Sequence, residues 1–100
     1  MKMLNIVCRE KLESELVALF NDLGIKGYTV MSGLGGRGES GAVSEHSWID
    51  RNMMFMVALD ERQLAPLTSA VKHLYAKLLN EYLGQEVPLK VFLQPCEVII

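Results

Sequence analysis

A glycine-rich segment carries the strongest sign of chemistry in this sequence. Five of the eight glycines lie close together, at Gly33, Gly35, Gly36, Gly38 and Gly41. Glycine has no Cβ, so backbone N–H groups in such a run can approach an anion closely. Arg37 adds a planar fork of donors that suits phosphate or carboxylate. We therefore predict an anion-binding loop, with a flexible hairpin loop that holds no ligand as the alternative.

The glycine run matches neither of two familiar nucleotide-binding motifs. A Walker motif needs Gly-Lys-Ser/Thr after the glycines, and a dinucleotide fingerprint has to open a helix. Neither condition holds for the residues that follow Gly38. Any anion bound here must therefore be held by another kind of site.

The polar continuation of this segment holds a histidine and the chain's only tryptophan. His46 lies beside Glu45 and close to Asp50, and an imidazole with two carboxylates can hold a metal ion. One histidine in a flexible loop is a weak ligand set, so solvated polar side chains are the favoured interpretation. Trp48 predicts contact with a partner or another subunit, and packing onto its own domain explains it equally well.

No group of residues indicates catalysis. His46, Ser47 and Asp50 crowd one loop, whereas catalysis needs a rigid arrangement. Cys8 and Cys96 have no histidine nearby in the sequence and are predicted to be buried free thiols, because disulfides are rare in the cytoplasm. The sequence therefore predicts a binding or signalling module and not an enzyme, with no catalytic residue, resident metal or cofactor.

Six elements must position these residues. Apolar patterning predicts strands over 3–8, 27–32, 53–59 and 89–93 and helices over 10–23 and 60–82. Asp60 and Gln63 predict a capping box, Gly24 and Gly84 are expected to end the helices, and Pro95 is expected to break the last strand. The order predicts an α+β, ferredoxin-like βαββαβ fold, with a four-stranded antiparallel sheet and two helices on one face.

This arrangement makes the chain a single domain of residues 1–100, with a long mobile loop over 33–51 between the second and third strands. Loops of this length in compact domains are usually functional. In the second helix, Tyr75 and Leu79 are predicted to belong to the apolar face. His73 is predicted to lie on the surface.

The third strand is apolar on both faces. Its two alternating sets are Phe55, Val57 and Leu59 on one face and Met54, Met56 and Ala58 on the other. One set can pack under the helices, and a contiguous apolar sheet face is not normally left exposed to water. The sequence therefore predicts that the chain oligomerises through its sheet.

Composition excludes other classes of partner. The chain has 10 basic and 12 acidic residues and a net charge of −2, which argues against nucleic-acid binding. The first strand has no aromatic residue, unlike RNA-recognition modules of the same topology. There is no apolar run long enough to insert into a membrane and no signal peptide, so the cytoplasm is the expected compartment.

Three short motifs resemble those of the nitrogen regulatory P-II superfamily, and the chain looks like a divergent P-II-like signalling protein. They are Gly27-Tyr28-Thr29-Val30, Gly33-Leu34-Gly35-Gly36-Arg37, which resembles the start of the family's T-loop, and the strand that runs from Lys90 to Ile99. The resemblance implies a homotrimer with its sheets facing inward and a ligand site in each cleft between subunits.

The resemblance also implies roles for individual residues. Gly27 and Thr29 would lie near the base of an adenine nucleotide. Gly35, Gly36 and Arg37 would approach its phosphates, and Lys90 would reach in from the start of the last strand. Gly33 would also belong to the ligand site. Ligand binding would order the T-loop, which would then dock on a partner protein such as a membrane transporter.

Departures from the family pattern bear on the ligand. The loop has no tyrosine, residues 84–89 lack a glycine-rich phosphate loop, and no arginines follow Ile100. ADP, AMP or bicarbonate is therefore favoured over ATP as the small-molecule effector. Two alternatives are a metal-responsive trimeric module that uses His46 or Cys96, related to metal tolerance or transport, and a ligand-free oligomerisation scaffold.

Overall fold

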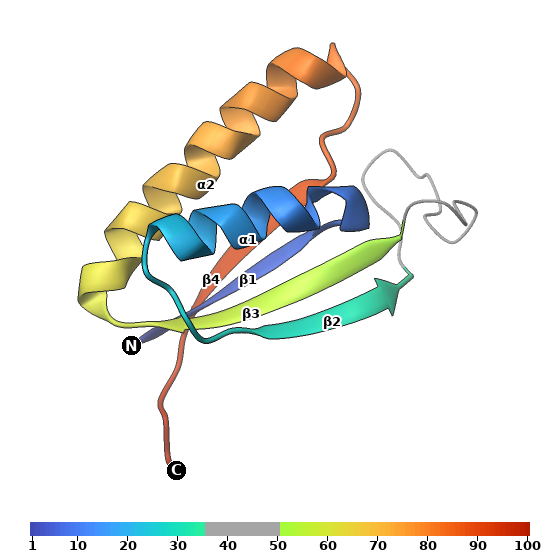
Figure 1. Ribbon diagram of the computed structural model, residues 1–100. Helices are drawn as coiled ribbons and strands as arrows, with labels where there is room; N and C mark the ends of the chain where they lie inside the picture. Colours follow the sequence, from blue (N-terminus) through green and yellow to red (C-terminus); the bar gives the residue numbers. More distant parts are fainter. Residues whose placement is uncertain (36–50) are drawn as a thin grey trace.

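The computed structural model describes residues 1–35 and 51–100. Along the chain lie β1 (Lys2–Arg9), a 3-10 turn (Glu10–Leu12), α1 (Glu13–Asp22), β2 (Thr29–Leu34), β3 (Asn52–Leu59), α2 (Glu61–Tyr82) and β4 (Leu89–Pro95). The sheet has the order β2-β3-β1-β4, and all its neighbouring strands are antiparallel. Both helices cover one face of the sheet (Figure 1). The predicted ferredoxin-like fold is confirmed.

The start of α2 follows from local sequence. Asp60 Oδ1 accepts a hydrogen bond from the Gln63 backbone N–H at 2.9 Å, and Gln63 Oε1 accepts one from the Asp60 backbone N–H at 3.2 Å. The predicted capping box is therefore confirmed. At the other end, Leu83 adopts a left-handed conformation with φ 48° before Gly84 does so with φ 87°.

Two strands differ from the predicted ranges by two residues at an end. β2 begins at Thr29 and runs on to Leu34, where Gly33 takes φ 69° within a bulge between Met31 and Leu34. β4 extends past Leu93 and ends at Pro95, which confirms the expectation that this proline ends the strand. β4 lies at the edge of the sheet, where a missing N–H costs no ladder hydrogen bond.

The core lies between the helices and one face of the sheet. It is centred on three aromatic rings, Phe20, Tyr28 and Phe55, whose centroids lie 4.9 to 5.6 Å apart. In β3, Met53, Phe55, Val57 and Leu59 are buried, while the intervening residues point to the face without helices, which we call the bare face. Cys8 is buried and Cys96 is half-buried, and both are free thiols.

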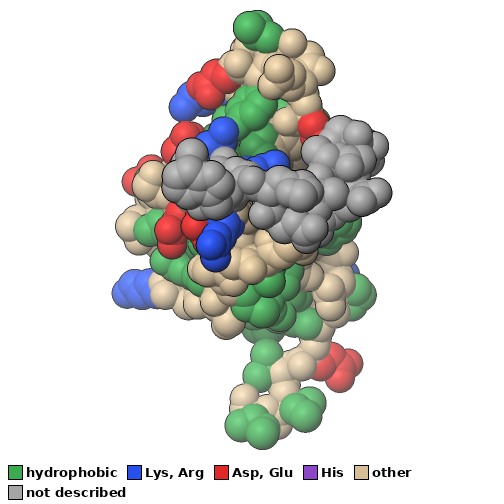
Figure 2. Space-filling view, turned by 90° about the vertical axis from the view of Figure 1, so that its right-hand side faces the viewer, with side chains coloured by type: hydrophobic (Ala, Val, Ile, Leu, Met, Phe, Trp, Pro, Cys, Tyr) green, Lys and Arg blue, Asp and Glu red, His purple; other side chains and the backbone are tan. Residues whose placement is uncertain are grey.

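Beyond β4, residues 97–100 leave the sheet and project away from the domain (Figure 1). Figure 2 shows apolar side chains on this segment at the bottom of the molecule. Val98 and Ile99 are 66% and 89% exposed. A short segment this apolar has no packing partner within the sheet or the helices described above.

Candidate functional site

The predicted ligand residues at one edge of the sheet lie along β2. Gly27 precedes this strand, Thr29 begins it, Gly33 lies in its bulge and Gly35 follows its end. All four are exposed, and a Cβ added at Gly27 or Gly33 would meet open space. The backbone here is therefore open to a ligand or to another subunit.

The remaining candidate residues of the sequence lie outside the described residues. They belong to residues 36–50 and are Gly36, Arg37, Gly38, Gly41, Glu45, His46, Ser47, Trp48 and Asp50. Their predicted roles in binding an anion, a metal or a partner stay predictions.

Lys90 lies at the opposite edge of the sheet. It is the second residue of β4, is exposed, and pairs with Val7 of β1. Since β2 and β4 are the two edges of the sheet, one chain does not bring Lys90 together with Gly27, Thr29 or Gly33. Within one chain, the predicted ligand residues therefore lie in two separate groups, the two predicted half-sites.

The bare face is apolar with a polar pair at its centre. Met54 and Met56 of β3 are half-buried on this face, and Phe92 of β4, which is 57% exposed, lies across Asn5 of β1 from Met56. Asn5 donates a hydrogen bond from Nδ2 to Gln94 Oε1 at 2.8 Å, whereas Asn5 Oδ1 is buried with no hydrogen-bond partner in the described part of the chain. The two-residue alternation of β1 and β4 predicts that both residues lie on this face, although neither was among the candidate residues of the sequence.

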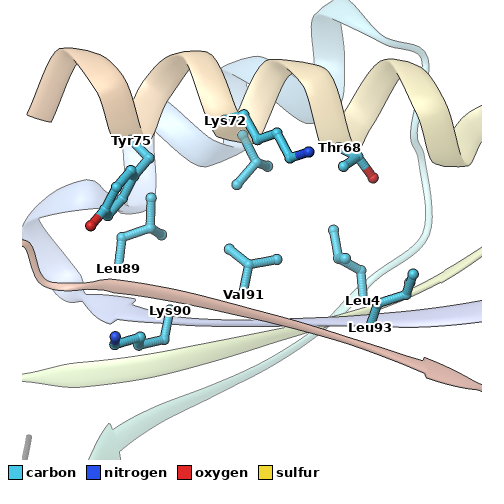
Figure 3. Close-up of a pocket in the computed structure, with 9 residues that line it drawn as sticks. Leu4, Thr68, Lys72, Tyr75, Leu89, Lys90, Val91 and Leu93 are labelled. Carbon is cyan, nitrogen blue, oxygen red and sulfur yellow. The ribbon is translucent and has the colours of Figure 1, made fainter.

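A second apolar surface lies on the helix side, between α2 and β4. We call it the α2–β4 groove: it has a volume of about 410 Å³ and is lined chiefly by Thr68, Lys72 and Tyr75 of α2 and by Leu89, Val91 and Leu93 of β4. In Figure 3 the α2 side chains point down toward the β4 side chains across the groove, and Lys90 of β4 also belongs to its lining.

The prediction that Tyr75 and Leu79 belong to the buried face of the second helix is wrong. Tyr75 and Leu79 were expected on the buried face of the second helix, yet they are 42% and 48% exposed. The reason is that their side of α2 faces the β4 edge across an open groove, where Val91 and Leu93 are exposed as well. The presence of Val91 and Leu93 in the last strand was the available signal for this surface.

Two features of the described residues bear on metal binding and on membrane insertion. Residues 1–35 and 51–100 contain no group of three or more His, Cys, Asp or Glu side chains that could hold a metal ion. In those same ranges, neither helix has the length and hydropathy needed to cross a bilayer. His73 is exposed on α2, as predicted.

Solved structures with the same fold include P-II-like proteins. CPII from Thiomonas intermedia K12, a nitrogen regulatory P-II-like protein bound to ADP, AMP and bicarbonate, is 23% identical, with a TM-score of 0.75 over 93% of this chain and 82% of that one. Another structure of CPII, with ADP and bicarbonate, gives 24% identity and a TM-score of 0.72 over the same shares. A putative P-II-like signalling protein from Thermus thermophilus is 22% identical, with a TM-score of 0.62 over 93% and 82% of the two chains.

Sequence comparison identifies the family. A comparison with curated protein sequences found no significant match. The family model "Nitrogen regulatory protein P-II" matches residues 1–99, almost the entire chain. The chain therefore belongs to the nitrogen regulatory protein P-II family, a family of regulatory proteins.

Proposed function

We propose that this chain is a homotrimeric signalling protein that binds an adenine nucleotide or a small anion in clefts between its subunits. In this proposal, ligand binding changes the loop over residues 33–51, which regulates a partner protein such as a transporter. The protein acts by binding and not by catalysis.

The observation that carries the proposal is the separation of the two half-sites. Thr29 and Lys90 lie at opposite edges of one sheet. A closed ring of identical subunits repeats one head-to-tail contact, so it can set the β4 edge of each copy against the β2 edge of the next. Residues that cannot meet within one chain then line a shared cleft.

Two further observations support the proposal. The bare face, with Met54, Met56 and Phe92, needs a cover, and inward-facing sheets would supply it. CPII, which shares the fold, has been solved with ADP, AMP and bicarbonate. These ligands agree with the preference for few phosphates that residues 84–89 suggest.

Calorimetry with ADP, AMP, ATP and bicarbonate, together with light scattering, tests the proposal. We expect a trimer that binds at least one of these ligands, with ATP bound less tightly than ADP or AMP. Arg37→Ala should weaken binding of the anion while the trimer stays assembled. A trimer that binds none of the four ligands, or a monomer at micromolar concentration, would contradict the proposal.

A further inference from the structure

Inward-facing sheets alone would not cover the α2–β4 groove, because the groove lies on the helix side, beside the β4 edge that the proposed function sets against the next copy. Val91 and Leu93 are 37% and 52% exposed there, beside Tyr75. A neighbouring hollow of about 520 Å³ shares Thr68, Lys72 and Leu93 with the groove and extends it toward the start of α2. The result is a continuous apolar channel along the helix.

Residues 97–100 form an apolar segment that is itself exposed. This segment, Glu97-Val98-Ile99-Ile100, projects from the domain with its apolar side chains in water. Exposing consecutive large aliphatic side chains costs about 1.5 to 3 kcal/mol for each one that a partner would bury. The same chain thus carries an apolar channel and an apolar segment, and no residue of 1–35 or 51–100 covers either of them.

We infer that the α2–β4 groove of one copy binds residues 97–100 of a second copy. This inference rests on the self-association in the proposed function. It concerns the helix side of the sheet and not the bare face, at the same β4 edge to which the predicted ligand residue Lys90 belongs. Each copy would contact the next in the same head-to-tail manner. Such a contact closes into a ring when the rotation between neighbouring copies permits.

The dimensions of the two parts agree. Thr68 and Tyr75 are seven helical residues apart, which is about 10 Å at the rise of an α-helix. Three extended residues span about 10 Å as well. Val98, Ile99 and Ile100 can therefore lie along the channel between these two side chains.

The charges of the two parts agree as well. Lys72 stands over the channel in Figure 3, and it lines both hollows. Glu97 is the only charged residue of the projecting segment. With the aliphatic residues in the channel, the Glu97 carboxylate can lie near the Lys72 ammonium group, which stands about midway between Thr68 and Tyr75 along α2.

Photocrosslinking of the full chain tests this inference. One preparation carries p-benzoylphenylalanine in place of Ile99, and a second, unmodified preparation is labelled with nitrogen-15. The two are mixed by unfolding and refolding and then irradiated, and the joined peptides are identified by mass spectrometry. We expect crosslinks from position 99 of the light copy to residues 68–75 or 89–93 of the heavy copy. Crosslinks within one copy only, crosslinks to Met54 or Met56, or no joined chains would overturn the inference.

Sedimentation over a range of concentrations gives an independent readout. Ile99→Asp and Leu93→Asp should each weaken self-association about tenfold or more, because each places a carboxylate in the apolar contact. Leu83→Asp is the matched control, since Leu83 is 87% exposed and does not line the groove. Equal association constants for all three variants and the parent would contradict the inference.

A charge reversal tests the pairing of Glu97 with Lys72. Lys72→Glu should weaken self-association about threefold, and adding Glu97→Lys should restore it. Arg62→Glu, also on α2 but not among the residues that line the groove, is the control. A monomeric parent chain would overturn both this inference and the proposed function. A trimer with crosslinks elsewhere would overturn this inference alone.

Discussion

Thr29 and Lys90 lie on the same face of the sheet but at its opposite edges. Thr29 pairs with Met56 of β3, and Lys90 pairs with Val7 of β1. Three inter-strand steps separate the two edges, which amounts to about 14 Å across the sheet. A ligand site that uses both residues at close range therefore has to form between copies of the chain.

Replacing Lys90 should weaken ligand binding without affecting assembly. Lys90→Ala removes a cation that can form a charge-assisted hydrogen bond, so we expect binding of ADP or AMP to fall about tenfold or more in calorimetry. Lys77→Ala is the matched control, because Lys77 is an exposed lysine of α2 whose surface ion pair with Glu15 contributes little. Equal losses in the two variants would remove Lys90 from the site.

Mixing two defective variants should restore part of the binding. In a site shared between subunits, Arg37→Ala and Lys90→Ala damage opposite sides of the cleft. Random trimers refolded from equal amounts should contain about a quarter of clefts with both sides intact. Titration calorimetry of the mixture should recover that fraction. No recovery, with mixed trimers demonstrated by mass spectrometry, would place both residues in a site within one chain.

A charge on the bare face should prevent self-association. Met56→Asp places a carboxylate at the centre of the apolar face, and burying it without a partner should weaken assembly by about 3 kcal/mol, roughly 100-fold. Light scattering at micromolar concentration should then report a monomer. Ala18→Asp on the exposed surface of α1 is the control and should leave the trimer intact. A trimeric Met56→Asp variant would show that another surface holds the subunits together.

Two phenylalanines should separate folding from assembly. Phe55 is fully buried against Phe20 and Tyr28, so Phe55→Ala should lower the free energy of unfolding by about 3 to 5 kcal/mol. Phe92 is 57% exposed in the single chain, so Phe92→Ala should lower the association constant and leave the fold intact. Urea unfolding at two protein concentrations and sedimentation distinguish the effects. Loss of the folded subunit in Phe92→Ala would contradict its assignment to an interface.

The capping box at the start of α2 should contribute to stability by itself. Asp60→Ala removes the acceptor of the Gln63 backbone N–H and should cost about 1 kcal/mol in urea unfolding at fixed protein concentration. Asp60→Asn, which keeps a side-chain acceptor, should recover most of the loss. An unchanged free energy of unfolding in Asp60→Ala would mean that tertiary packing alone defines the start of this helix.

Local features of this protein follow directly from its sequence. The Asp60–Gln63 box depends on residues three apart, and the alternation of Phe55 and Val57 with Met54 and Met56 depends on the two-residue period of a strand. Gly24 takes φ 71° after α1 for a reason equally local, since glycine favours the left-handed region. These signals lie within a few residues of one another, so the βαββαβ order and the two-faced apolar sheet are readable without the structure.

The order of the strands in space is decided only by the tertiary structure. The sequence order does not state that β2 and β4 are the edges, yet this placement puts Thr29 and Lys90 in separate half-sites and lets Pro95 end an edge strand. The same placement leaves Val91 and Tyr75 exposed where α2 does not cover the β4 edge. Periodicity specifies which side of an element is apolar, but the packing of distant segments determines which apolar sides are covered. The apolar side chains that the helices leave exposed on the sheet therefore lie on two surfaces, the bare face and the α2–β4 groove. The reason is that pairing between segments far apart in the chain sets the edges of the sheet.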